Sequence, residues 1–207
     1  GEAGLCVAAA VLFAVLALAS RLRLRPGAAE RCIARFVRAA LSTATHWSQV
    51  RREMTDGAVQ VIVSNTGDAG WRLAGADQPP LVAPGAAAPQ AFPAKLLVLL
   101  HDRWQAQPQA ARTGRPGELG ARKGEALREL VAGLARAWQL PAAFEQWLRG
   151  HLVWGNSLVD RIVSAPLEPA GAIAEPYALW AIERAAGLRV PCAHPAIVEP
   201  GELARFE

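Results

Sequence analysis

Three small polar residues, Ser64, Asn65 and Thr66, follow a β-prone run over residues 58–63. The run is rich in valine and isoleucine, which is typical of a buried parallel strand. In open α/β sheets, ligands bind at the carboxyl ends of strands, where small side chains and free backbone amides meet them. An ordinary strand-end turn uses the same residue types. The triplet is therefore either part of a ligand site or a simple turn.

A carboxylate and a guanidinium stand side by side at Asp160 and Arg161, within the apolar run 158–163. Burial of such charges is costly unless they are paired or bound to something, and the run predicts that both are buried. Two interpretations stay open at this point: a structural ion pair that joins two elements, or a pair that faces a ligand. Asn156, four residues before Asp160, is a further polar candidate beside them.

Lys95 lies near the start of an expected helix, where a cation opposes the helix dipole. A cofactor phosphate or a carboxylate would stabilise it there, and a solvated or capping lysine is the simpler alternative. No metal site is predicted, because the four histidines lack the spacing of metal ligands and the group around Cys192 and His194 is too small. The three cysteines are odd in number and contain no CxxC, which favours a reducing, cytoplasmic compartment over a disulfide framework.

Helices and strands alternate along the chain, which predicts an α/β fold with a largely parallel sheet. The prolines in residues 79–93 predict an extended loop, and the Gly/Pro/Arg-rich residues 108–124 predict another. Thr45 is the candidate N-cap of one helix, and Pro141 occupies the first turn of another. Helices are expected over residues 28–41, 47–54, 95–105, 125–138 and 142–152, and strands over residues 58–63, 158–163 and 178–182.

The composition allows a real core, with 207 residues of which 52% are hydrophobic. Charge is distributed unevenly: residues 1–52 carry eight arginines against two glutamates, whereas the remainder carries 14 Lys/Arg against 16 Asp/Glu. The basic residues flank apolar runs and match no nucleic-acid-binding motif, so no nucleic-acid partner is expected. The seven tryptophans fall singly, which predicts core positions, as for Tyr177 and Trp180 in the segment 175–183.

Residues 5–19 form an apolar run of 15 residues that is followed by Arg21-Leu-Arg-Leu-Arg25. The run is short for a membrane span, although an arginine-rich flank is typical of the inner end of one. A signal peptide would carry its charge before the apolar run. A buried helix of a globular domain is the favoured interpretation, and membrane association is the minor alternative.

Four segments resemble, in order, the polyol-type long-chain dehydrogenases: mannitol dehydrogenase, fructuronate reductase and tagaturonate (altronate) reductase. They are Val61-Ile-Val-Ser-Asn-Thr-Gly-Asp-Ala-Gly-Trp71, Ala91-Phe-Pro-Ala-Lys-Leu96, Asn156-Ser-Leu-Val-Asp-Arg-Ile-Val163 and Glu175-Pro-Tyr-Ala-Leu-Trp-Ala-Ile-Glu183. The resemblance implies a partial Rossmann-like parallel sheet with flanking helices, without the C-terminal helical substrate domain. It divides the chain into residues 1–40, a helical segment of uncertain origin, and residues 41–207, an incomplete nucleotide-binding domain.

The resemblance also implies a chemistry. These enzymes transfer hydride between a nicotinamide cofactor and the keto or hydroxyl carbon of a sugar acid or sugar alcohol, without a metal. It gives NAD as the cofactor, with NADP as an alternative, and favours the tagaturonate/altronate branch. By the same resemblance Ser64, Asn65 and Thr66 contact the cofactor, Asp160 is the catalytic candidate on the substrate side, and Asn156 and Arg161 join Asp160 as substrate-binding residues.

Three departures from the family pattern support a different interpretation. A Gly-rich dinucleotide fingerprint is not found at the start of the sequence. Lys123 stands where the family has the asparagine of an Asn-Gly pair, and no lysine follows it, so the family's catalytic Lys-x4-Asn-x2-His helix is not matched. The alternatives to a working reductase are a non-catalytic remnant of one and, on the apolar run alone, a membrane-tethered interaction protein.

Overall fold

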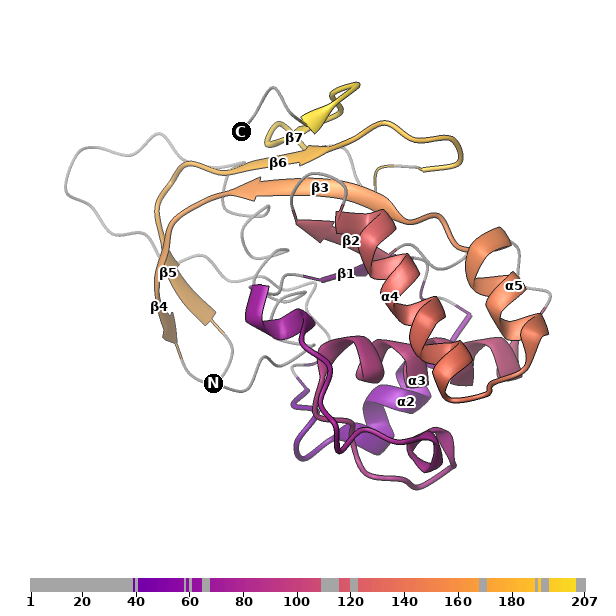
Figure 1. Ribbon diagram of the computed structural model, residues 1–207. Helices are drawn as coiled ribbons and strands as arrows, with labels where there is room; N and C mark the ends of the chain where they lie inside the picture. Colours follow the sequence, from indigo (N-terminus) through magenta and orange to yellow (C-terminus); the bar gives the residue numbers. More distant parts are fainter. Residues whose placement is uncertain are drawn as a thin grey trace.

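The computed structural model describes residues 39, 41–57, 59, 61–64, 68–108, 116–119, 123–167, 171–188, 190 and 194–203. These residues form one five-stranded sheet, a separate two-stranded hairpin, and helices stacked beside the larger sheet (Figure 1). The helix expected within residues 1–40, the apolar run 5–19, and the candidates Asn65 and Thr66 lie outside the described residues. Within the described residues, no helix is long and apolar enough to cross a membrane.

The larger sheet has the strand order β1-β2-β3-β6-β7. Strands β1 and β2, β2 and β3, and β6 and β7 pair in parallel, whereas β3 and β6 pair antiparallel. The sheet is therefore mixed and mostly parallel, which confirms the predicted α/β class. The strands are β1 (Ile62–Val63), β2 (Pro116–Leu119), β3 (Gly155–Asp160), β6 (Leu179–Ile182) and β7 (Ile197–Val198).

Strand β2 corrects the prediction that residues 108–124 form a loop. Its sequence, Pro-Gly-Glu-Leu, has low β-propensity, yet it pairs with β1 on one side and β3 on the other. Two neighbouring strands supply the ladder that local sequence does not favour. Strand β7 was also not predicted, and it pairs with β6.

A hairpin of β4 (Val163–Leu167) and β5 (Gly171–Ala174) follows β3 and projects from the main sheet in Figure 1. The strand predicted over 158–163 is therefore divided: β3 begins earlier and ends at Asp160, and Val163 opens the hairpin. Ile162 and Ile173 are 67% and 50% exposed. Tyr177 is 52% exposed, so its predicted core position is wrong, whereas Trp180 is buried as expected.

Four α-helices are described: α2 (Trp47–Thr55), α3 (Phe92–Ala106), α4 (Lys123–Ala137) and α5 (Ala142–Gly150). All four confirm predicted helices, and two short 3-10 turns, η1 (Asp68–Trp71) and η2 (Pro79–Val82), lie between α2 and α3. Helix α3 begins at Phe92, inside the predicted loop, because Pro93 suits a first helical turn. The predicted cap Thr45 is wrong: the N-cap of α2 is His46, without a side-chain cap bond.

Helix α3 is the centre of the core. Five consecutive residues, 96–100, are at most 2% exposed, so the helix is covered on every side. Helix α2 packs against it on one side and α4 on another, and α4 in turn contacts β2 and β3. Most tryptophans with described side chains are buried, in agreement with the prediction; they are Trp47, Trp138, Trp147, Trp154 and Trp180.

Two charged groups hold α2 against α3. The Arg51 guanidinium donates to both carboxylate oxygens of Asp102, at 2.6 and 2.7 Å, and to the carbonyls of Val82 and Ala83. Arg103 is fully buried and donates to the carbonyls of Met54, Asp56 and Val59 at 2.6–3.1 Å. It caps the C-terminal end of α2, where a cation also complements the helix dipole. Burial lowers the pKa of Arg103, partly offset by Asp56.

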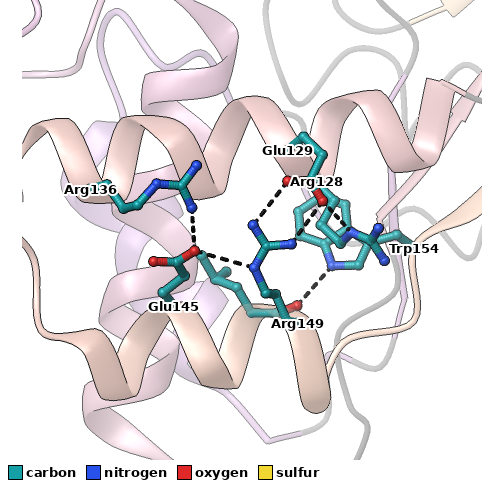
Figure 2. A network of polar contacts seen from close by, with 7 residues as sticks. Arg128, Glu129, Arg136, Glu145, Arg149 and Trp154 are labelled. Carbon is teal, nitrogen blue, oxygen red and sulfur yellow. Dashed lines mark hydrogen bonds and ion pairs between the residues drawn. The ribbon is translucent and has the colours of Figure 1, made fainter.

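A network of ion pairs joins α4 to α5 on the surface (Figure 2). Arg149 on α5 donates to both carboxylate oxygens of Glu129 on α4, at 2.8 and 2.9 Å. The Glu145 carboxylate on α5 accepts hydrogen bonds from Arg149 on the same helix and from Arg136 on α4. The hydrogen bonds from Arg149 lower the pKa of Glu129 to about 2. Because Glu129 is half exposed, solvent screening limits the stability that the network contributes.

Candidate functional site

The candidate residues lie on two strands of the larger sheet: Ser64 follows β1 and Asp160 ends β3, whereas Asn156 is the second residue of β3. Ser64 follows β1 directly and is only 4% exposed. It is the one member of the Ser64–Thr66 triplet that lies within the described residues. Among the described residues of the predicted strand 58–63, two are paired, Ile62 and Val63.

The register of the strands places the candidate residues at different heights along the sheet. Val63 is level with Gly117, and Gly117 is level with Gly155. Ser64 is therefore level with Asn156 across β2, about 10 Å away at two strand spacings. Asp160 lies four residues further along β3, roughly 13 Å beyond that level. Strand β3 thus runs past the ends of β1 and β2, and Asp160 stands at the tip of the overhang.

Asp160 is exposed, which corrects the expectation that its charge is buried. Its backbone pairs with Leu179 on β6, which fixes the end of the strand. The carboxylate makes no hydrogen bond or ion pair with another described residue. It is therefore held in place by the backbone alone, with its charge available to solvent or to a ligand.

Arg161 is half-buried and its side chain turns to the hairpin. Its Nε and Nη2 donate to the Glu175 carbonyl at 2.9 and 2.6 Å, while the Ile162 amide donates to the Glu175 carboxylate at 2.6 Å. Burial lowers the pKa of the Arg161 guanidinium, and the Glu175 charge partly offsets this. These contacts join the end of β3 to the segment between β5 and β6.

Asn156 is 4% exposed and forms a joint between α4, β3 and β6. Its Oδ1 accepts from the Gly124 amide at 2.8 Å, and its Nδ2 donates to Glu183 at 2.6 Å and to Glu125 at 3.3 Å. The Glu183 amide also donates to the Asn156 carbonyl at 3.0 Å. Both ends of the side-chain amide are therefore satisfied by protein groups.

Gly124 is required at this joint. A Cβ at this position would lie 2.6 Å from the Gly155 carbonyl oxygen and 3.0 Å from Asn156 Oδ1. The close approach sets the start of α4, and with it Lys123, the first residue of that helix. The Gly124–Asn156–Glu183 joint was not predicted, and the only sequence signal for it was a glycine at a helix start.

Two sequence predictions remain, one for the position of Lys95 and one on metal binding. Lys95 is half-buried in the first turn of α3, as predicted from its place near a helix start. No group of three or more His, Cys, Asp or Glu side chains that could hold a metal ion occurs among the described residues.

Comparison with known sequences identifies relatives over part of the chain. An altronate oxidoreductase of Yersinia enterocolitica is 45% identical over 112 residues, which cover 53% of this chain and 22% of that protein. An altronate oxidoreductase of Halalkalibacterium halodurans is 32% identical over 162 residues, covering 69% of this chain and 30% of that protein. The chain thus spans less than a third of the length of these relatives.

Solved structures share the fold. A Pseudomonas fluorescens mannitol 2-dehydrogenase, determined with NAD and D-mannitol, superposes with a TM-score of 0.60 at 12% identity, over 80% of this chain and 38% of that one. A D-sorbitol dehydrogenase in substrate-free form gives a TM-score of 0.57 at 14% identity, over 76% of this chain and 37% of that one. At these identities the similarity concerns the fold, and it confirms a Rossmann-like domain.

The family model of the mannitol dehydrogenase Rossmann domain matches residues 28–190. The match contains all four segments on which the resemblance was based. The domain boundary at residue 40 stays a prediction. From its mostly parallel sheet, its strand-end residues and this match over most of its length, the chain belongs to the mannitol dehydrogenase family of oxidoreductases.

Proposed function

We propose that the chain binds a nicotinamide cofactor, NAD in preference to NADP, as the nucleotide-binding part of a hexuronate reductase of the tagaturonate/altronate type. The observation that carries the proposal is the set of adjacent parallel strands β1, β2 and β3 in a chain of this family, with Ser64 and Asp160 at strand ends. The altronate oxidoreductase relatives favour a sugar acid over a sugar alcohol as the substrate.

On the cofactor side, the proposed contacts are Ser64, Asn65 and Thr66. Small side chains at the end of a parallel strand let a dinucleotide approach the backbone closely. The low exposure of Ser64 supports a role in shaping the floor of this site. The cofactor would supply the hydride chemistry, and the protein its orientation.

On the substrate side, Asp160 is the proposed catalytic residue, with Arg161 next to it in the chain and Asn156 about 13 Å away along β3. Asp160 combines an ordered backbone with an exposed carboxylate, which suits contact with a hydroxyl-rich ligand. The bonds of Arg161 to Glu175 and of Asn156 to Gly124 and Glu183 favour a positioning contribution from these two residues. They would hold the end of β3 and the start of α4 against the site.

A non-catalytic nucleotide-binding protein is the second candidate, and Lys123 favours it. This lysine begins α4 at the joint with β3, where the family pattern has an asparagine. A lysine carries a charge and a longer side chain there, so it would change the electrostatics of any carbonyl bound nearby. This candidate keeps cofactor binding and loses turnover.

Cofactor binding is tested by titrating the purified chain with NADH and NADPH while the tryptophan fluorescence is recorded. Saturable quenching with tighter binding of NADH is expected. Asn65→Ala and Thr66→Val should each weaken binding about tenfold. Thr55→Val, at the far end of α2, is the matched control and should leave the affinity unchanged. A folded chain that shows no saturable quenching would overturn the proposal.

Turnover is tested by adding tagaturonate to the NADH complex and following loss of the reduced cofactor. Consumption of NADH supports the reductase. The decisive protein contains this chain and spans the full length of its relatives. If it binds NADH without consuming it, the non-catalytic nucleotide-binding protein is favoured.

A further inference from the structure

Exposed apolar side chains gather at the hairpin of β4 and β5. Among the described residues, five large hydrophobic side chains are exposed, and four of these lie within residues 162–177. The four are Ile162, Val163, Ile173 and Tyr177. Residues 162–174 contain a single charged residue, Glu168. A concentrated apolar patch with so little charge is typical of a surface that binds another protein.

The hairpin receives little support from the rest of the protein. Strands β4 and β5 pair only with each other among the described strands, and the hairpin projects from the larger sheet (Figure 1). The hydrogen bonds of Arg161 and Ile162 to Glu175 hold its base. A two-stranded hairpin is marginally stable in water by itself, and a further strand stabilises it. Such a strand can be added at an edge whose backbone groups are unpaired.

The peptide groups of β5 show which of its residues face the unpaired edge. The Ile173 carbonyl accepts from the serine hydroxyl of β4 at 3.3 Å, and the Glu175 amide donates to the Ile162 carbonyl at 3.1 Å, so both face the β4 side. Peptide groups point alternately to the two sides of an antiparallel strand. The amides and carbonyls of Ala172 and Ala174 therefore point away from β4.

The outer edge of β4 is interrupted by a proline. Pro166 lies opposite Ala172 in the ladder. Because the Ala172 peptide groups face outward, these two residues exchange no hydrogen bond, and the Pro166 nitrogen faces outward as well. That nitrogen carries no hydrogen, so β4 lacks a donor where a further strand would pair. The β5 edge is thus the one at which this hairpin can accept a strand.

We propose that two copies of this chain associate through β5 and form a four-stranded antiparallel sheet in the order β4-β5-β5-β4. With the two-fold axis at Ile173, Ala172 of one copy pairs with Ala174 of the other through the groups that face outward. The two Ile173 residues lie opposite each other, at a Cα spacing of about 4.5 Å, and cover each other's side chains. Such an isologous contact closes on itself, so association stops at the dimer.

The sequence of the edge favours a second copy over a different protein. Ala172-Ile173-Ala174 reads the same in both directions, so antiparallel pairing with itself sets each small residue against a small one. Strand β5 contains no charged residue, so no like charges meet across the axis and no side chain selects a charged partner. The dimer is independent of the function proposed above, because no proposed cofactor or substrate contact belongs to the hairpin.

The test is sedimentation velocity of the whole chain over a concentration series from about 1 to about 200 µM. A shift from the mass of one chain to twice that mass is expected. Ile173→Lys places two ammonium groups opposite each other and should weaken the dimer at least about tenfold. Leu73→Lys is the matched control, because Leu73 is also 50% exposed but lies outside the hairpin. This variant should dimerise as the unmodified chain does.

Ile173→Cys tests the pairing itself. Under mild oxidation two copies should become linked through position 173, because facing residues of this pair type have the spacing of a disulfide. Peptide mapping distinguishes this link from links through the native cysteines, and Leu73→Cys should give no link through position 73. The substitution is small, so it tests the dimer even if Ile173→Lys fails to fold.

Three results would overturn the proposal. A chain that stays monomeric over the whole series, with no link through position 173, would leave the patch to a different protein. Equal weakening by Ile173→Lys and Leu73→Lys would reflect general apolar association. Oligomers that grow beyond two copies would show that a second edge also pairs, which contradicts a closed dimer.

Discussion

Charged side chains differ in burial and in hydrogen-bond partners between the helical half of the molecule and the strand-end half. Among the helices, Arg103 is fully buried and is surrounded by three carbonyl acceptors, and Asp102 is held by both branches of Arg51. At the strand ends, Asp160 is exposed and bonds to no described side chain. A charge that is paired with other groups of the protein serves the fold, whereas an ordered charge without a described partner is available for a ligand. This contrast separates structural from functional residues better than residue type does.

The largest expected loss of stability is for Arg103→Met. The substitution fills part of the volume but leaves the carbonyls of Met54, Asp56 and Val59 without their donor in a buried place. The free energy of unfolding should fall by about 3 kcal/mol, measured by urea denaturation. Arg72→Met, on the surface, should change it by less than about 0.5 kcal/mol. If both substitutions lower the free energy of unfolding by a similarly small amount, the buried charge of Arg103 does not serve the fold and the contrast is lost.

Gly124→Ala should have the next largest effect. The new Cβ would meet the Gly155 carbonyl at 2.6 Å, so α4 or β3 must shift, at a cost of about 2 kcal/mol. Gly133→Ala in the same helix is the matched control, because its Cβ would meet only Arg136 Nη2 at 3.9 Å. There the substitution should stabilise the protein by up to about 1 kcal/mol. A lower melting temperature for Gly124→Ala together with a higher one for Gly133→Ala would confirm the tight joint. Changes in the same direction would exclude it.

His101→Phe should change the pH dependence of stability. Burial lowers the pKa of His101 below its ordinary 6.5, with Asp102 partly opposing and Arg51 adding to the shift. The unfolded chain therefore binds a proton below about pH 6.5 that the folded chain takes up only at lower pH, and stability falls as pH decreases through this range. Phenylalanine at this position should flatten that slope while keeping the edge-on contact with Phe144. An unchanged slope in the His101→Phe variant would show that titration of other groups sets this pH dependence.

The smallest effect on stability is expected for Asp160→Ala. Since the carboxylate has no described partner, the free energy of unfolding should change by less than about 0.5 kcal/mol. Turnover of tagaturonate, in an enzyme that contains this chain, should fall about tenfold or more. A loss of stability as large as the loss of turnover would assign Asp160 to the structure instead of the substrate side.

The helices were predictable from sequence because their apolar spacing, and for α5 also Pro141, are local signals. Pro93 was assigned to a loop, although it lies in the first turn of α3. Strand β2 was not, because Pro116-Gly117 gains its extended form from β1 and β3, which lie far away in the chain. The exposure of Asp160 was missed for a related reason. Its apolar neighbours suggested burial, but β3 extends beyond β1 and β2, so the end of the strand has fewer elements to cover it.

For the candidate site, sequence alone gave the strand-end position of Ser64 and the identity of Asn156. It did not predict the structural role of Asn156, because the side-chain hydrogen bonds of Asn156 reach Gly124 and Glu183, which are remote along the chain. Arg161 was paired in the prediction with its neighbour Asp160, yet its described bonds go to Glu175. Such pairings depend on tertiary geometry and leave no periodic signal in the sequence.

The order in which the halves form follows from the pairing of the strands. The contacts of α4 with α5 and of α3 with α4 join helices separated by 4 and 16 residues, so they close shorter loops than the strand pairs do and should form early in folding. Ile62 must find Pro116, and Gly117 must find Gly155, across whole helices. The strand ends that carry the candidate site are therefore expected to assemble last during refolding. In native-state hydrogen exchange, amides of β1 should lose protection before those of the centre of α3.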